Sequence, residues 1–145
     1  MQVGMARPAD KTHWWPLWQA YLTFYRNPLP DALSDLTFAR FVDANQPMHL
    51  LVAKKAGKML GFASLIYHGS TWAWTDYAYL EDLFVSPEAR GQGVGRALIE
   101  AVSATAKKAG SERLYWLTDR DNTTAQALYD RLAEKTDFIL YRREP

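Results

Sequence analysis

The sequence predicts a single α/β domain over residues 1–145, and two observations lead to this expectation. At 145 residues and 48% hydrophobic content, the chain is long enough to bury one core and too short for two. Its apolar patterns switch between strand and helix periods in the order strand, two helices, three strands, helix, strand, helix, strand. No internal repeat or low-complexity linker interrupts that order.

The N-terminal part begins with a short strand at residues 3–7, which Pro8 ends. A first helix follows Asp10, a suitable N-cap, and is unusually rich in aromatic side chains up to Tyr25. These aromatics either fill the core or line one wall of a binding pocket, since aromatic faces attract ammonium groups. A second helix begins at Asp31, after a proline-rich break, and ends near residues 45–47.

Residues 48–53 and 59–68 predict two strands joined by a hairpin turn at 54–58. Gly61 inside the second strand marks a bulge or a close approach of another backbone. The loop 69–76 carries Trp72 and Trp74, which are candidate substrate contacts, and packing of both against the first helix is an equal alternative. The following strand, at 76–85, is expected to be the most buried of the sheet.

The C-terminal part repeats the alternation. Apolar residues recur at helical spacing from Val94, with Gly110 as a natural C-cap. A strand is expected at 113–118, a helix capped by Asp121 or Asn122 comes next, and a last strand is expected at 138–141.

The turn between the 76–85 strand and the helix at Val94 predicts an anion site. The first amides of a helix lack intrahelical partners, and the helix dipole adds positive charge there. Gly91, Gly93 and Gly95 allow an anion to approach the backbone, and Arg96 in the first helical turn is favourable only beside an anion. We therefore expect a phosphate group at this turn.

Two familiar phosphate loops do not fit. The Walker sequence Gly-x-x-x-x-Gly-Lys-Ser/Thr is absent, and the dinucleotide fingerprint needs a glycine where Arg96 stands. The loop instead reads Arg90-x-x-Gly93-x-Gly95, directly after a strand.

Glu81 and Asp82 are the unusual residues of the strand at 76–85. Side chains at adjacent strand positions point to opposite faces, so both carboxylates cannot lie on one solvated side of a central strand. Burying an unpaired carboxylate is costly, and such residues gather at functional sites. Alternatively, Asp82 bonds to backbone or to a basic partner and serves the structure alone.

Composition excludes several classes of function. The chain has 17 basic and 16 acidic side chains, which gives no sign of a nucleic-acid or membrane surface. It has no cysteine, and His13, His49 and His68 stand singly, so no metal site is expected. Without a long apolar run or a signal-peptide pattern, a cytoplasmic location is expected.

These residues resemble the GCN5-related N-acetyltransferases (GNAT), whose loop for acetyl-coenzyme A reads Arg/Gln-x-x-Gly-x-Gly/Ala. Within that superfamily the chain is similar to the diamine (spermidine/spermine) and the small histone-and-polyamine acetyltransferases, mainly over residues 76–141. The strand Tyr79-Leu-Glu-Asp-Leu-Phe-Val85 matches the diamine enzymes, and so do Trp116, Thr118, Asn122 and Ala125-x-x-Leu128-Tyr129. The resemblance implies the GNAT fold: a central mixed, mostly antiparallel sheet with helices on both faces and a splayed strand pair that binds the cofactor.

The resemblance also assigns residues to acetyl-CoA. It implies that backbone groups of the splayed strand hold the pantetheine, that the loop from Arg90 holds the pyrophosphate, and that Asn122 touches the cofactor arm. The strand residues are Leu83, Phe84 and Val85, and the loop residues are Arg90, Gly91, Gln92, Gly93, Val94, Gly95 and Arg96.

For the chemistry, the resemblance implies Glu81 as the base, acting through water, and Tyr129 as the general acid. An amine with a pKa near about 10 is mostly ammonium at neutral pH, so deprotonation costs roughly 4 to 5 kcal/mol and needs a base. A backbone amide beside Phe84 is the candidate donor to the oxyanion. Helical spacing alone would make Tyr129 a core aromatic instead.

The acceptor expected from these features is a primary amine on a small molecule: a small amine, a polyamine or an amino acid. Tyr25, Arg26 and Asp82 are candidate contacts beside the two loop tryptophans, and Arg26 would repel a polyamine but grip a carboxylate. The alternatives are a protein or histone lysine as acceptor, and a non-catalytic module that binds acyl-CoA. A homodimer is expected, because the aromatic surplus provides material for an interface.

Overall fold

The computed structural model describes all of residues 1–145 and shows a five-stranded sheet in the order β1-β2-β3-β4-β5. The strands are β1 (Gln2–Met5), β2 (Met48–Lys55), β3 (Lys58–His68), β4 (Tyr77–Val85) and β5 (Arg113–Tyr115). Neighbouring strands are antiparallel from β1 to β4, and β5 runs parallel to β4. The helices are α1 (Lys11–Phe24), α2 (Asp31–Phe41), α3 (Val94–Lys108) and α4 (Thr123–Tyr129), with short 3-10 turns η1 (Pro8–Asp10) and η2 (Pro87–Ala89).

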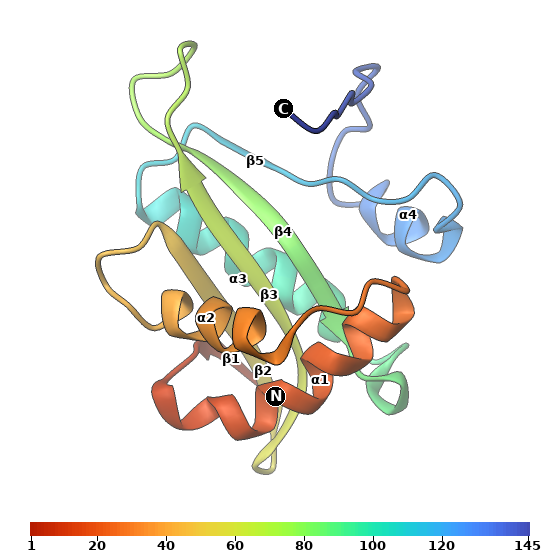
Figure 1. Cartoon of the computed structure of the whole chain (residues 1–145). Helices are drawn as coiled ribbons and strands as arrows, with labels where there is room; N and C mark the ends of the chain where they lie inside the picture. Colours follow the sequence, from red (N-terminus) through yellow and green to blue (C-terminus); the bar gives the residue numbers. More distant parts are fainter.

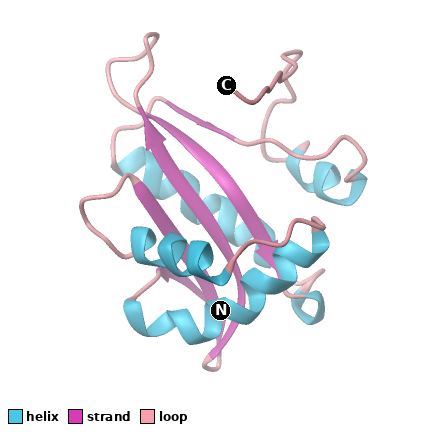
Figure 2. Cartoon of the chain, in the orientation of Figure 1, coloured by secondary structure: helices cyan, strands magenta, loops and turns pink.

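The sheet has helices on both faces, as predicted. Figures 1 and 2 show α1 and α2 on one side of the strands and α3 behind them. The mixed, mostly antiparallel sheet expected from the sequence is therefore confirmed. None of these helices combines the length and the hydropathy that a membrane span requires.

Each face of the sheet carries its own apolar core. On the α3 face, Leu98 and Val102 are fully buried against strand residues such as Leu65 and Leu80. On the other face, Trp14 of α1 stacks on Trp18 with ring centroids 5.1 Å apart, and both belong to a cluster with Phe62 of β3. Most of the aromatic side chains of α1 thus fill the core. The two roles that the sequence left open for this helix, filling the core and lining a pocket, are taken by different residues.

A β-bulge in β4 changes the expected alternation of its side chains. Ala63 of β3 pairs with Leu83 and Leu65 pairs with Leu80, so Glu81 and Asp82 together oppose Ser64 alone. Leu80 and Leu83 consequently both face the α3 core although they are three residues apart. The expectation that Glu81 and Asp82 point to opposite faces was wrong, because the bulge places both carboxylates on the α1 side, where Asp82 reaches α1 and Glu81 lines a cleft with α1 residues.

Strands β4 and β5 separate beyond their first three pairs. Pairing joins Tyr77–Tyr79 to Arg113–Tyr115, and β5 ends there rather than at residue 118 as the sequence suggested. From Leu80 onward, the edge of β4 that faces β5 has no ladder partner. The splayed strand pair is confirmed, and Figure 1 shows β5 leaving the sheet towards α4.

Gly61 marks both a bulge and a close approach: Ala53 pairs with Gly61 and Lys54 pairs with Met59, so one extra residue of β3 stands next to Gly61. A Cβ placed on Gly61 would lie 2.5 Å from the carbonyl oxygen of Phe84 on the neighbouring strand. Any side chain here would therefore displace β4 next to its splayed end.

The predicted strand at residues 138–141 does not form. Phe138, Ile139, Leu140 and Tyr141 have no ladder partner and are 92%, 67%, 71% and 86% exposed. The prediction of a strand here was wrong: the residues have strand propensity, but no strand of the sheet pairs with them.

Asp10 ties the N-terminal turn to the sheet. It stands at the start of α1 without making a side-chain cap. Its buried carboxylate instead accepts hydrogen bonds from the Arg7 amide at 2.8 Å and from Lys54 Nζ of β2. Burial raises the pKa of Asp10, and the bonds from Lys54 and Arg7 outweigh that effect and hold it below its usual value.

Candidate active site

A cleft opens where β4 and β5 separate. It draws its lining residues from four segments. Its lining residues are Tyr21 and Tyr25 of α1, Leu80, Glu81 and Leu83 of β4, Trp116, Leu117 and Thr118 beyond β5, and Tyr129 of α4. The structure thus brings the two expected catalytic residues, Glu81 and Tyr129, to one cleft. Tyr21 was missed by sequence reasoning, although its place one turn before Tyr25 on α1 carries the signal.

Glu81 lies on the bulge, at the cleft, with its side chain open to solvent. Partial burial, and then the nearby charge of Asp82, raise the pKa of the Glu81 carboxyl. A carboxylate with a raised pKa accepts protons more readily at neutral pH than an ordinary one. Glu81 has the position and the electrostatics of a general base.

Tyr129 is the last residue of α4, and its side chain lines the cleft. Its ring meets Trp116 edge-on, with centroids 5.5 Å apart. Burial, and then Tyr25, raise the pKa of Tyr129 to about 12. The hydroxyl is therefore protonated at neutral pH and can donate a hydrogen bond to a ligand in the cleft.

Tyr25 caps the C-terminal end of α1 and lines the cleft, whereas Arg26, the next residue, is not among the lining residues. Burial, followed by the charges of Asp119 and Asp82, raises the pKa of Tyr25. Arg26 is exposed and adopts the left-handed conformation, with φ of 53°. Glycine or asparagine is usual at this position after a helix, because other residues are strained there.

The turn before α3 has the backbone of an anion site. Gly91 and Gly93 have positive φ angles of 74° and 80°, and Gly93 caps the helix in the left-handed conformation. Gly95 faces Leu128 and Val85, where a Cβ would meet ordinary van der Waals contacts. The space beside Gly91 and Gly93 is open, because a Cβ on either residue would meet no atom within 4 Å. An anion can therefore approach the N-terminal end of α3 from this loop.

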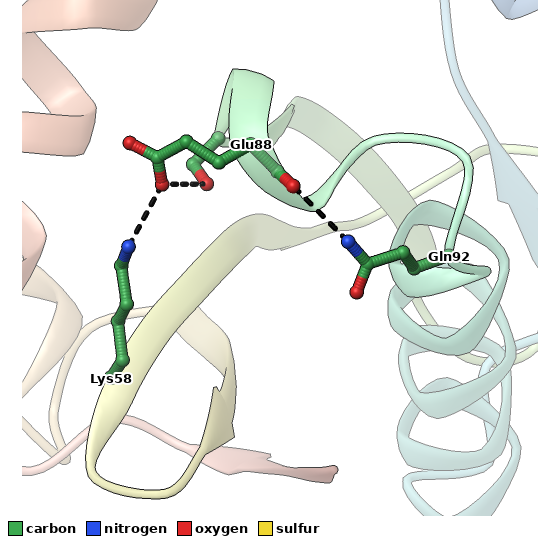
Figure 3. Close-up of polar contacts among 4 residues, drawn as sticks. Lys58, Glu88 and Gln92 are labelled. Atoms are coloured by element: carbon green, nitrogen blue, oxygen red, sulfur yellow. Dashed lines mark hydrogen bonds and ion pairs between the residues drawn. The ribbon is translucent and has the colours of Figure 1, made fainter.

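Side chains of this turn are held back from the helix end. Glu88 accepts a hydrogen bond from Lys58 Nζ at 2.9 Å, and Gln92 Nε2 donates to the Glu88 carbonyl at 3.1 Å (Figure 3). Arg90 Nε donates to the Val85 carbonyl at 3.2 Å, and Arg96 makes a loose 3.8 Å pair with Glu100. The side chains of Glu88, Arg90 and Gln92 are therefore engaged with neighbouring groups of the turn, of β3 and of β4.

The remaining predicted residues have mixed placements. Leu83 lines the cleft, and Phe84 is buried between β4 and α1. Asn122 caps α4, accepting a hydrogen bond from the Ala125 amide at 3.2 Å, so one of the two capping alternatives is settled. Trp72 and Trp74 are 88% and 97% exposed and do not line the cleft.

A family model places the chain. The model described as the acetyltransferase (GNAT) family matches residues 14–133. The chain belongs to the GNAT acetyltransferase family. It is 38% identical over 143 residues to the D-amino-acid N-acetyltransferase HPA3 of Saccharomyces cerevisiae, covering 97% of this chain and 89% of that protein. It is also 29% identical over 147 residues to an aminoglycoside N(6')-acetyltransferase of Stenotrophomonas maltophilia, covering 99% and 92%.

Solved structures share this GNAT fold. A probable acetyltransferase superposes with a TM-score of 0.88 at 23% identity, covering 100% of this chain and 98% of that one. AAC(6')-Iy, in complex with the bisubstrate analog CoA-S-monomethyl-acetylneamine, superposes with a TM-score of 0.86 at 22% identity, covering 99% and 97%. The expectation of a GNAT fold is confirmed.

As a GNAT N-acetyltransferase, the protein uses acetyl-CoA as its acyl donor. Two features of this chain fit that molecule. The unpaired edge of β4 beyond Tyr79 leaves backbone groups for the amides of a pantetheine arm, and the α3 N-terminus with its two left-handed glycines suits a pyrophosphate.

Proposed function

We propose that this GNAT enzyme acetylates the primary amine of a small amino acid by direct attack in a ternary complex. Glu81 acts as base through a water molecule, and Tyr129 acts as general acid. The observation that carries the proposal is the common cleft of Glu81 and Tyr129, which lies at the fork between β4 and β5.

The proposed mechanism uses a proton acceptor and a proton donor that both line the cleft. The acceptor ammonium gives a proton, through water, to Glu81. The free amine then forms a bond to the acetyl carbonyl carbon, its nitrogen gives a second proton to water, and the carbon–sulfur bond breaks, while Glu81 returns its own proton to solvent. The Tyr129 hydroxyl donates a hydrogen bond to the leaving sulfur as its charge develops, and the proton of the thiol product is supplied through this hydroxyl from solvent.

An amino-acid acceptor is favoured by the end of α1. Arg26 holds a strained backbone conformation, and a residue other than glycine at such a position points to a use for its side chain. A guanidinium there suits the carboxylate of an amino acid. The similarity to a D-amino-acid N-acetyltransferase supports the same class of acceptor.

The proposal is tested by measuring thiol release with D- and L-amino acids, the matching amines without a carboxylate, spermidine and a lysine peptide. Amino acids should give the highest kcat/KM. Arg26→Gly, which also relieves the backbone strain, should raise KM for amino acids about tenfold or more and leave the carboxylate-free amines unchanged. Preference for spermidine or the peptide would contradict the acceptor assignment. Full activity of Glu81→Gln would contradict the mechanism.

We also propose that the enzyme is a homodimer that covers the C-terminal segment 138–141. Phe138, Tyr141, Trp72 and Trp74 are each 86% or more exposed. Four aromatic side chains can bury together roughly 600 to 1,000 Å², near the ~800 Å² that each partner contributes to a stable interface. Sedimentation equilibrium should give a dimer for the wild type and a monomer for the Phe138→Asp, Tyr141→Asp variant. A monomeric wild type would refute this proposal.

A further inference from the structure

Asp82 lies at the centre of a small hydrogen-bond network behind the cleft. Its carboxylate accepts a hydrogen bond from the Tyr21 hydroxyl at 2.8 Å and another from the Ser64 hydroxyl at 2.5 Å. The Ser64 oxygen in turn accepts a hydrogen bond from the Asp82 amide at 3.0 Å. Ser64 is completely buried, and Asp82 is partly buried.

Ser64 compensates for the bulge in β4. A bulge leaves one residue of the longer strand without its ladder partner, and here two residues, Glu81 and Asp82, oppose Ser64. The Ser64 hydroxyl accepts a hydrogen bond from the Asp82 amide, which has no partner in the strand ladder. Because a buried amide without a partner is costly, this side chain stabilises the bulged conformation over a regular one.

Tyr21 extends the network to α1. Its ring packs edge-on against Phe62 and Phe84, at 5.8 and 5.9 Å between centroids, and it also lines the cleft. Burial, and then the Asp82 charge, raise the pKa of Tyr21, so its hydroxyl stays protonated and remains the donor. The bulge is thus fastened to both β3 and α1.

We propose that Ser64, Asp82 and Tyr21 are positioning residues, which hold the β4 bulge in one conformation and thereby keep the Glu81 carboxylate on the α1 side of the fork. The argument is one of strand geometry. Without the bulge, alternation along β4 would move Glu81 relative to Leu80 and Leu83, which are fixed in the α3 core. The inference rests on the proposed role of Glu81 as base.

Asp82 also sets the charge environment of Glu81. The titratable groups facing this region are Tyr21 and Tyr25 of α1, Tyr79 and Asp82 of β4, and Tyr129 of α4. No lysine, arginine or histidine forms an ion pair with Glu81 or Asp82. Removing the Asp82 charge should therefore lower the pKa of Glu81, an effect that a purely structural residue would not have.

The test compares four variants with the wild-type enzyme. Ser64→Ala and Tyr21→Phe remove one hydroxyl each, and Asp82→Asn removes the charge while keeping the shape. Ser34→Ala is the matched control, because Ser34 of α2 is equally buried, accepts a hydrogen bond from Trp18 Nε1 at 2.8 Å and does not line the cleft. Measurements are kcat, its pH profile, and acetyl-CoA affinity by calorimetry.

Ser64→Ala and Tyr21→Phe should lower kcat about 10- to 100-fold, since a small displacement of a catalytic group has effects of that size, with acetyl-CoA affinity within about twofold. Asp82→Asn should move the acid limb of the kcat profile to lower pH. Ser34→Ala should alter neither kcat nor the limb, even if it lowers the melting temperature.

Glu81→Gln separates this inference from the mechanism that it rests on. If Glu81→Gln loses activity while Ser64→Ala and Tyr21→Phe keep wild-type kcat and Asp82→Asn keeps the wild-type acid limb, the positioning role is refuted and the base survives. If Glu81→Gln is as active as the wild type, the proposed base itself is wrong. Should Ser64→Ala fail to fold, Tyr21→Phe, which keeps the aromatic packing, decides the question.

Discussion

Removing the Tyr129 hydroxyl should slow acetyl transfer by a limited and calculable factor. Tyr129→Phe keeps the ring that packs against Trp116, so the fold and acetyl-CoA binding should be unchanged. With the pKa of Tyr129 at about 12 and an ordinary thiol near about 8.5, complete proton transfer to the sulfur is uphill by roughly 5 kcal/mol. Most of the benefit must then come from a hydrogen bond to the developing thiolate. Such a charge-assisted bond contributes about 1.5 to 3 kcal/mol, which corresponds to a loss of roughly 10- to 150-fold in kcat.

The assay is thiol release at saturating acetyl-CoA and amino acid, followed from pH 6 to pH 10.5. Because Tyr129 stays protonated up to about pH 12, the wild-type profile should show no alkaline limb from this residue in that range. A raised tyrosine pKa extends the activity to higher pH, because the hydroxyl keeps its proton there. A wild-type alkaline limb near pH 8 to 9 that disappears in Tyr129→Phe would refute the burial argument. An unchanged kcat in Tyr129→Phe would refute the role of Tyr129 altogether.

Three further predictions concern the loop, the sheet and the N-terminal turn. Gly93→Asp puts a carboxylate at the α3 N-terminus on a residue with φ of 80°, so calorimetry should show acetyl-CoA binding weakened about 100-fold or more. Unchanged affinity would exclude a phosphate there. Gly61→Ala would push against the Phe84 carbonyl, and chemical unfolding should show a loss of about 1 to 3 kcal/mol together with weaker acetyl-CoA binding. Wild-type stability in this variant would contradict the close approach. The pKa of Asp10 in the folded chain lies below its usual value, so its stabilising effect is present above about pH 4 and is lost as the pH falls further. Asp10→Asn should therefore be less stable than the wild type at pH 7 in urea unfolding, and the difference should shrink below pH 4; a constant difference would contradict the ion pair with Lys54.

Local sequence signals were enough to place most elements of the fold. The apolar period starting at Val94 and the C-cap at Gly110 located α3 to within two residues. The hairpin turn around Gly57 located β2 and β3 similarly well, and the proline before Asp31 located the start of α2, which ends at Phe41 rather than near residues 45–47 as expected. These signals work because capping and turn chemistry act over a few neighbouring residues.

Features that depend on two strands at once were not predictable from local signals. The alternation rule assumes an unbroken ladder, and nothing in the residues 79–85 shows that Ser64, some 18 positions earlier, will oppose two residues of β4. The strand expected at 138–141 failed for the same reason, since strand propensity does not supply a partner. Tyr21 entered the site only when α1 packed across β4.

The bulge and the fork together explain why Glu81 can be both exposed and fixed. Strand β4 is central at Tyr77–Tyr79, where β3 and β5 both pair with it, and becomes an edge strand immediately afterwards. An edge carboxylate on a regular strand would have solvent on one side and little to hold it. Here the next residue, Asp82, is anchored to β3 through Ser64 and to α1 through Tyr21, so the backbone that carries Glu81 is rigid although its side chain is open to solvent. A base that must meet both water and a substrate amine requires this combination, and under the proposed mechanism the two adjacent acidic residues divide the tasks of anchoring and proton transfer.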